Sequence, residues 1–358
     1  MELLILKTGA LGDVLRTTSI LPGLRAAQPD ERVVWVTAPA AVDLVRTHPL
    51  VDEVLALDPK DAEAARALGA ELEQRRWSRV LSFDDEEPLC ALATQLGAPR
   101  EAGGPVSGAY LRADGQRAYS TDVGAWFDMG LLSVHGKEEA DRRKVLNQES
   151  HPAIYARMLG IAMGEPRLEL PPESTAFAAD FAERHQLHGA GAAIGLNTGA
   201  GGRWESKKLP VERVVELAAA LTAADERPPT FLVLGGRDER ERNDRILEGL
   251  AAAGVRAVDA GTDNSLLDFA ALIDRLDLLL TSDSLALHMA VARHVRLVSF
   301  FAPTSAAEIE LYGRGEKVVS TAPDYCSYKA DADNSTITVE RLLEAVQRVR
   351  REHGAQTR

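Results

Sequence analysis

The fold is decided by the stretch Leu3-Leu4-Ile5-Leu6-Lys7-Thr8-Gly9-Ala10-Leu11-Gly12-Asp13-Val14-Leu15. The apolar run at its start predicts a short strand that is buried on both faces, as in a parallel sheet. Apolar residues then recur at helical spacing, so a helix should follow the loop. Gly9 and Gly12 allow the loop backbone to approach a ligand closely. Asp13 is either a helix-start residue, favoured there by the helix dipole, or a functional carboxylate.

The alternation of strand and helix continues through the first half of the chain. Apolar runs predict strands at 33–36, 54–57 and 80–83, with helices at 40–45, 61–76 and 88–96. This order is typical of an α/β fold in which helices cover both faces of a parallel sheet. Ligands bind beyond the carboxyl ends of the strands in such sheets, which again indicates residues 7–13. The acidic run 84–87 is interpreted as a solvated turn before a helix rather than a metal site.

Length and composition limit the class of protein. A chain of 358 residues predicts about two domains, and the prolines between 166 and 172 place their boundary at residue 172. The net charge of −13 argues against nucleic acid as a partner and against broad adhesion to anionic lipid. No apolar run is long enough to span a membrane, and the first apolar run lacks the features of a signal peptide. Cys90 and Cys326 lie far apart without metal spacing, so we expect reduced thiols in a cytoplasmic protein.

A glycine-rich loop, Asn197-Thr198-Gly199-Ala200-Gly201-Gly202-Arg203-Trp204-Glu205-Ser206-Lys207-Lys208-Leu209-Pro210, separates a predicted strand at 192–196 from a predicted helix at 211–221. Its backbone amides, the Thr198 hydroxyl, Arg203 and the two lysines would suit a pyrophosphate at a helix N-terminus. The alternative is a flexible surface loop.

Two further strand ends carry polar groups. Gly235 follows a predicted strand and allows close ligand approach, while Glu239 is either a ribose-binding residue or a first-turn helix acid. Asp283 and Ser284 open a predicted helix, where Ser284 can cap and the first amides can face an anion. His288 lies about one turn later and is either a ligand-binding residue or a core histidine.

Three of these stretches carry a family resemblance. The opening loop, followed by Thr17-Thr18, resembles the start of the family 9 glycosyltransferases, the heptosyltransferases that build the inner core of bacterial lipopolysaccharide. The segment 283–290 is similar to the family motif Asp-Ser/Thr-Gly-x-x-His-x-Ala, except that Leu285 replaces the glycine. The loop ending in Lys207-Lys208-Leu209-Pro210 resembles the family's donor-phosphate loop.

The resemblance implies a GT-B type α/β fold with two facing Rossmann-like domains, each with a parallel sheet. Residues 1–172 would bind the acceptor, residues 173–335 would bind the nucleotide sugar, and a terminal helix within 336–358 would pack back on the first domain. The implied reaction is an inverting, metal-independent transfer of heptose from ADP-heptose to a glycan or glycolipid such as the lipopolysaccharide inner core, with no cofactor.

The resemblance also implies individual roles. Asp13 would be the catalytic base and Lys207 would stabilise the leaving diphosphate, with Lys208 as the competing lysine. The other implied donor-binding residues are Thr198, Gly199, Lys208, Gly235, Glu239, Asp283, Ser284 and His288, and the acceptor-binding residues are Lys7, Gly9, Gly12, Arg142 and Arg143.

The basic run Arg142-Arg143-Lys144 is either a solvated helix face or an acceptor-facing surface. We hypothesise that residues 126–147 bind one anionic or polar group locally, since long-range attraction between this acidic chain and an anionic membrane should be weak. A less anionic glycan is then an alternative acceptor, and peripheral contact with the inner face of the membrane stays open.

Other functions were weighed against this one. Within the transferases, the alternative is another nucleotide sugar with a small-molecule or non-lipid acceptor. A nucleotide-dependent oxidoreductase is disfavoured because no Gly-x-Gly-x-x-Gly follows the first strand. A non-catalytic sugar-nucleotide binder is disfavoured by the presence of Asp13.

Overall fold

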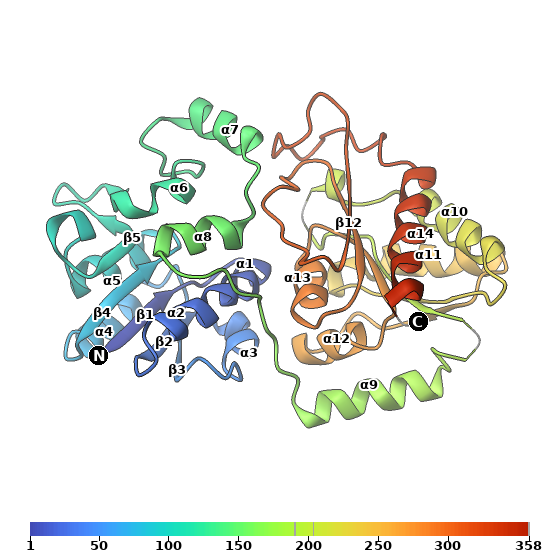
Figure 1. Ribbon diagram of the computed structural model, residues 1–358, viewed down its shortest axis with the longest axis horizontal. Coiled ribbons are helices and arrows are strands. Elements are labelled where there is room, and N and C mark those ends of the chain that lie inside the picture. Colours follow the sequence, from blue (N-terminus) through green and yellow to red (C-terminus); the bar gives the residue numbers. More distant parts are fainter. Residues whose placement is uncertain (190, 203, 357–358) are drawn as a thin grey trace. The chain divides into compact units, whose positions relative to one another are not determined.

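The computed structural model describes residues 1–189, 191–202 and 204–356 (Figure 1). The chain divides into two compact units, Met1–Glu169 and Leu170–Arg358. Within the described ranges no helix is long and apolar enough to cross a membrane. Cys90 and Cys326 are both buried, and burial, with the nearby Asp85 carboxylate, raises the pKa of the Cys90 thiol to about 12.

The first unit is built on a sheet with the strand order β3-β2-β1-β4-β5-β6. Leu4 of the central strand lies opposite Val34 on one side and Val80 on the other, in parallel pairing, whereas β6 is antiparallel to β5. The buried apolar run of β1 therefore agrees with its place in the middle of the sheet. The strands are β1 (Glu2–Leu6), β2 (Arg32–Thr37), β3 (Glu53–Ala56), β4 (Trp77–Ser82), β5 (Val106–Leu111) and β6 (Arg117–Tyr119).

The helices of the first unit begin and end close to sequence signals. Asp61 caps the N-terminus of α4 by accepting hydrogen bonds from the amides of Glu63 and Ala64 at 3.0 and 2.9 Å. α4 and α5 cover one face of the sheet, where Leu72 and Leu89 join its apolar residues in one core cluster. The helices are α1 (Leu11–Thr17), α2 (Leu21–Ala27), α3 (Val42–Val45), α4 (Ala62–Leu72), α5 (Glu87–Leu96), α6 (Gly124–Phe127), α7 (Lys137–Leu146) and α8 (His151–Leu159).

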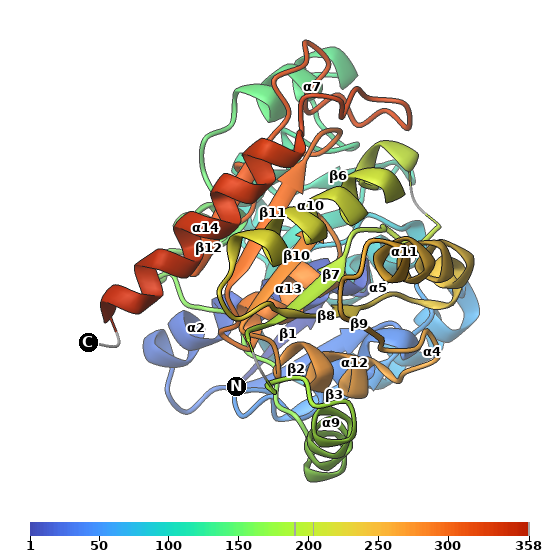
Figure 2. The ribbon, with the colours of Figure 1, turned by 90° about the vertical axis from the view of Figure 1, so that its right-hand side faces the viewer.

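The second unit repeats this plan with a parallel sheet in the order β12-β11-β10-β7-β8-β9. Its strands are β7 (Ala193–Asn197), β8 (Thr230–Val233), β9 (Ala257–Asp259), β10 (Leu278–Ser282), β11 (Leu297–Phe301) and β12 (Gly315–Val319). Its helices are α9 (Pro172–Arg184), α10 (Val211–Ala224), α11 (Arg240–Ala252), α12 (Leu266–Ile273), α13 (Leu285–Ala292) and α14 (Val339–Gln356). α14 runs beside α10 over the sheet (Figure 2).

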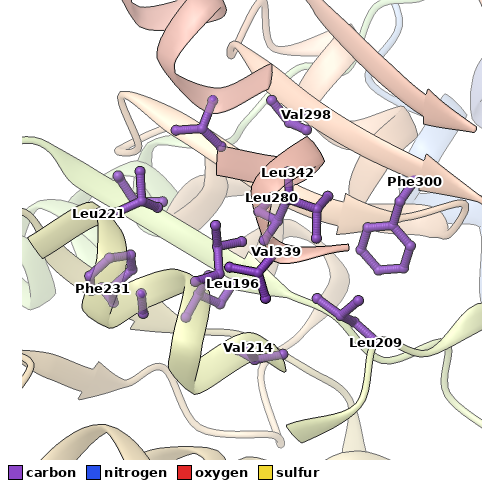
Figure 3. Packing of buried hydrophobic residues seen from close by; sticks show 14 of the residues in the cluster. Leu196, Leu209, Val214, Leu221, Phe231, Leu280, Val298, Phe300, Val339 and Leu342 are labelled. Atoms are coloured by element: carbon purple, nitrogen blue, oxygen red, sulfur yellow. The ribbon is translucent and has the colours of Figure 1, made fainter. Parts of the chain in front are cut away.

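The apolar side of α14 packs within the second unit, and contact of this helix with the first domain stays a prediction. Its buried residues Leu342, Ala345, Val346 and Val349 recur at helical spacing and join the core cluster of the second sheet. Figure 3 shows Leu342 among residues of the neighbouring strands β10 and β11. The apolar side of α14 thus covers β11 and β12, and the helix belongs to the second unit.

Candidate active site

The strand order of each sheet reverses at its first strand. β1 lies between β2 and β4, and β7 lies between β8 and β10, so the connections on either side of these strands leave in opposite directions. Such switch points create the crevice in which open α/β sheets bind ligands, beyond the carboxyl ends of the strands. The loop after β1 therefore meets the residues after β4, and the glycine-rich loop after β7 meets the residues after β10.

At the first switch point, Asp84 holds the loop that follows β1. Its carboxylate accepts hydrogen bonds from the Thr8 hydroxyl at 2.8 Å and the Gly9 amide at 3.3 Å, and also from the Lys7 ammonium and the Thr8 amide. The side chain of Asp84 is only 8% exposed. The interpretation of residues 84–87 as a solvated turn is therefore wrong for Asp84. The reason is the strand order, which places the acid after β4 against the donors after β1.

The residues predicted to bind the acceptor differ in how far they are already engaged. The Lys7 ammonium is bound to Asp84 and to the carbonyl of Gly9 and is largely buried, so its cation helps to shape the loop. Gly9 borders open space, because a Cβ added there would meet no atom within 4 Å. Gly12 lies in the first turn of α1. Acceptor contact by these three residues stays a prediction.

Asp13 also lies on α1 and is paired with a residue that the sequence reading did not single out. Its Oδ1 is 3.0 Å from the guanidinium of Arg16, one turn further along the helix. The Asp13 side chain is 38% exposed, whereas that of Arg16 is only 12% exposed. The carboxylate thus remains accessible while its cationic partner is buried.

The basic run on α7 is largely neutralised within the first unit. Arg142 forms two hydrogen bonds to Glu139, at 2.7 and 2.8 Å. Arg143 binds both Glu139 and Asp128 at 2.9 Å. Any anionic group bound here must compete with these carboxylates, so the predicted role of Arg142 and Arg143 in acceptor binding is untested.

At the second switch point, Lys207 meets Asp283. Lys207 ends a short 3-10 helix, Glu205–Lys207, and its Nζ lies 3.0 Å from Asp283 Oδ2. Burial alone would raise the pKa of the Asp283 carboxyl, but the charges of Lys207 and His288 and hydrogen bonds to the carboxylate outweigh it and lower the pKa. His288 is a buried residue of α13. The structure therefore brings the predicted catalytic Lys207 together with two predicted donor-binding residues, Asp283 and His288.

Asn197, the last residue of β7, connects the two loops and was not singled out in the sequence. Its Oδ1 accepts hydrogen bonds from Ser284 Oγ at 3.1 Å and from Thr281 Oγ1 at 3.4 Å. Ser284 was expected to cap α13, but its hydroxyl makes no capping hydrogen bond and turns towards Asn197 instead. The N-cap side chain therefore does not engage the first amides of α13.

Gly199 and Gly235 lie in close packing around Glu239, where a larger residue would have to displace a neighbouring side chain. A Cβ at position 199 would lie 1.6 Å from Glu239 Oε1, and a Cβ at position 235 would lie 2.7 Å from Asn243 Nδ2. Glu239 Oε2 accepts a hydrogen bond from the Gly236 amide at 2.9 Å. These contacts give Gly199 and Gly235 a structural role and hold Glu239 at the point where the loops meet.

The rest of the glycine-rich loop is held by its own unit. Arg242 donates to Thr198 Oγ1 at 3.1 Å and to the Thr198 carbonyl at 3.2 Å. Lys208 pairs with the exposed Glu205, while its carbonyl accepts a hydrogen bond from Asn334 at 2.9 Å. Arg203 lies outside the described residues. Both ends of the loop are therefore held by hydrogen bonds within the second unit.

Leu285, which replaces the glycine of the family motif, is the first residue of α13. Its backbone is helical and does not have a positive φ. The helix start at this position therefore needs no glycine for conformational reasons.

Two other features bear on the site. Among the described residues, no group of three or more histidine, cysteine, aspartate or glutamate side chains is arranged to hold a metal ion. A cavity of about 740 Å³ opens between Ala192, Leu278 and Arg296, at the amino ends of β7, β10 and β11. This cavity lies at the opposite edge of the sheet from Lys207 and Asp283, so it is separate from the proposed donor site.

A chain with two Rossmann-like sheets, each covered by helices and each with its switch point at its first strand, has the GT-B class of fold. Solved structures of known proteins share this fold. A protein of glycosyltransferase family 9 from Veillonella parvula superimposes with a TM-score of 0.73 at 19% identity, covering 97% of this chain and 96% of that one. The E. coli ADP-heptose LPS heptosyltransferase II superimposes with a TM-score of 0.66 at 19% identity, covering 99% and 100%.

Sequence comparison leads to the family. The model of glycosyltransferase family 9 (heptosyltransferase) matches residues 130–338, more than half of the chain. The lipopolysaccharide heptosyltransferase 1 of Campylobacter coli is 22% identical over 361 residues, which cover 97% of this chain and 98% of that protein. The chain belongs to glycosyltransferase family 9. It is a glycosyltransferase enzyme with the predicted GT-B type fold.

Proposed function

We propose that this enzyme transfers heptose from ADP-heptose to a hydroxyl group of a glycan or glycolipid acceptor, with inversion at the anomeric carbon. The observation that carries the proposal is the Lys207–Asp283 pair, 3.0 Å apart, on the loops that meet at the second switch point. The names of two similar proteins, an ADP-heptose LPS heptosyltransferase and a lipopolysaccharide heptosyltransferase, support this donor and acceptor.

In the proposed complex, the donor diphosphate lies against the glycine-rich loop. The Lys207 ammonium has three donors and can bind Asp283 and a phosphate oxygen together. The Thr198 hydroxyl and the uncapped amides at the start of α13 supply further donors. Glu239 is proposed to bind the ribose, and His288 the sugar or the adjoining phosphate.

In the proposed reaction, Asp13 removes the proton from the acceptor hydroxyl. The acceptor oxygen then forms a bond to the anomeric carbon as the bond between that carbon and the diphosphate oxygen breaks. ADP leaves with the electron pair, and its charge is met by Lys207, Thr198 and the Ser284 amide. These groups make a metal ion unnecessary in the proposal.

The acceptor is proposed to be the inner core of lipopolysaccharide, met in the cytoplasm at the inner face of the membrane. The first unit would recognise it locally through Lys7, Gly9, Gly12 and the α7 arginines. A less anionic glycan is the alternative, favoured by the ion pairs that occupy Arg142 and Arg143.

The test combines donor choice with loss of the base. Wild-type enzyme should bind ADP more tightly than UDP by calorimetry and should transfer heptose in the presence of EDTA, with the product inverted by NMR. Asp13→Asn should keep ADP affinity and lower turnover by about 10²–10⁴-fold. Asp43→Asn, which changes a similar helical aspartate of the first unit, is the control and should stay active. Near-full transfer by Asp13→Asn would show that Asp13 is not the base.

A further inference from the structure

Arg16 occupies an unusual place for a charged residue. Its guanidinium is 3.0 Å from Asp13 Oδ1, but its side chain is only 12% exposed. A second Asp–Arg pair with the same spacing, Asp43–Arg46 on α3, shows the usual arrangement. Its atoms are 2.7 Å apart, and the side chains are 42% and 58% exposed. The two pairs therefore share geometry and differ in what surrounds the arginine.

The surroundings of Arg16 are aromatic. Its Cζ lies 5.5 Å from the centroid of the Trp126 ring, within the range of a cation–π contact. The Trp126 ring meets the His151 ring at 4.9 Å and 87° and the Tyr155 ring at 5.5 Å and 81°. These edge-to-face contacts fix the plane of the indole against which the guanidinium lies.

The cluster extends into the core of the first unit. His151 and Tyr155 are each 1% exposed, and their rings are 3.8 Å apart. Tyr155 also contacts Phe83, the residue directly after β4, at 4.7 Å. Trp126 on α6 is therefore supported by α8 and by the end of a central strand, and none of these residues can move without disturbing the core.

The contact with Trp126 makes the Asp13–Arg16 ion pair more rigid than an exposed pair. An exposed pair holds two mobile side chains in one geometry and contributes little. Arg16 is already ordered by Trp126, so binding Oδ1 restricts the Asp13 carboxylate with little further loss of side-chain freedom. The planar guanidinium both stacks on the indole and donates to the carboxylate, which an ammonium group cannot do equally well.

We propose that Arg16 is a positioning residue for Asp13, and that Trp126 holds Arg16 in place. The inference deepens the proposed function, because it rests on Asp13 acting as the base. Arg16 contacts neither substrate in this proposal. Arg16 acts on the reaction by orienting the Asp13 carboxylate towards the acceptor hydroxyl.

Kinetics of the full-length enzyme with ADP-heptose test this role. Arg16→Gln should lower kcat by about 10- to 100-fold with the donor KM nearly unchanged, which is the effect expected when a reacting group is misplaced. Arg16→Lys should recover part of the loss, and Trp126→Leu should lower kcat less than Arg16→Gln. Arg46→Gln is the matched control and should leave kcat unchanged.

The double variant separates positioning from general damage. Because Arg16 acts through Asp13, adding Arg16→Gln to Asp13→Asn should lower kcat little further. A full additional loss in the double variant, or an effect of Arg16→Gln on KM alone, would overturn the inference. Circular dichroism and ADP calorimetry on each variant report whether the chain is still folded.

A second measurement needs no substrate. In side-chain NMR relaxation, the Arg16 Nε–H group should be ordered and that of Arg46 mobile, and Trp126→Leu should release Arg16. The Asp13 carboxyl carbon should become mobile in Arg16→Gln. If wild-type enzyme transfers nothing from ADP-heptose, the proposed function fails and this measurement alone decides the inference. A mobile Arg16, or an Asp13 carboxyl unaffected by Arg16→Gln, would refute it.

Discussion

Replacing Lys207 by alanine should weaken ADP binding far more than replacing its neighbour Lys208. The two lysines are adjacent in sequence, yet their ammonium groups are held differently. Lys207 is 14% exposed and lies 3.0 Å from Asp283, which is itself 18% exposed. Lys208 is covered to a similar degree, at 19% exposed, but its partner Glu205 is 82% exposed. The Lys207 pair joins the loop after β7 to the residues after β10, whereas the Lys208 pair lies within one loop.

The expected magnitudes follow from this difference. A charge-assisted hydrogen bond to a phosphate contributes about 1.5–3 kcal/mol, so loss of Lys207 should raise the Kd for ADP by about 10- to 150-fold. Lys208 instead points to an exposed carboxylate of its own loop, and an ion pair of that kind contributes about 0–1 kcal/mol, so its loss should change the Kd by less than about 5-fold.

Isothermal titration calorimetry with ADP on both alanine variants measures the two Kd values. The double variant Lys207→Ala/Asp283→Asn adds a control, because Lys207→Ala leaves the Asp283 carboxylate without its cation. The double variant should regain thermal stability relative to Lys207→Ala but not ADP affinity. A larger loss of affinity in Lys208→Ala than in Lys207→Ala would refute the reasoning and assign the diphosphate to the other lysine.

Three further predictions concern the first unit. Asp84→Ala should destabilise the first unit by about 3–5 kcal/mol, because the buried Lys7 cation loses its partner. Glu87→Gln is the control and should have little effect on the free energy of unfolding measured by chemical denaturation. Burial, with the nearby Arg167 charge, lowers the pKa of His48 to about 4, so the unfolded chain takes up a proton first as the pH falls from 6.5. Between pH 6.5 and 4, the free energy of unfolding of the wild-type enzyme should therefore fall by up to about 3 kcal/mol more than that of His48→Asn. Equal pH profiles of unfolding for the two proteins would contradict this. Vesicles of anionic lipid at physiological salt should co-sediment little enzyme, and strong binding that survives replacement of residues 142–144 by alanine would contradict local recognition.

The elements that depend on local sequence were predictable. The apolar run of β1 is buried on both faces, and the glycine-rich loop follows β7 and places Lys207 against Asp283, while its phosphate-binding role stays a prediction. Asp84 was misinterpreted because a run of four acids is usually solvated, and only the strand order reveals that it faces the donors after β1. Neighbouring strands in a parallel sheet are far apart in the chain, so such contacts leave no local pattern.

The same limit explains the residues that sequence reading missed. Asn197 looks in the sequence like an ordinary first residue of a loop. In the structure its side-chain oxygen accepts a hydrogen bond from the Ser284 hydroxyl, which follows β10 on the other side of the switch point. The sequence around Arg16 does not predict its contact with the Trp126 indole, because Trp126 lies on a separate helix far along the chain. The amphipathic pattern of α14 predicts one buried face but not its partner, which the structure identifies as the core of the second unit.

The place of α14 in the second core sets an order for folding during synthesis. All elements of the first unit precede residue 170, so that unit can complete its core while the rest of the chain is still being made. The second unit cannot, because Leu342, Ala345 and Val346 cover strands that were made much earlier. Until α14 emerges from the ribosome, the apolar face that β11 and β12 present to this helix stays open to misassociation. A premature stop before Val339 would therefore yield a folded first unit joined to an aggregation-prone second one.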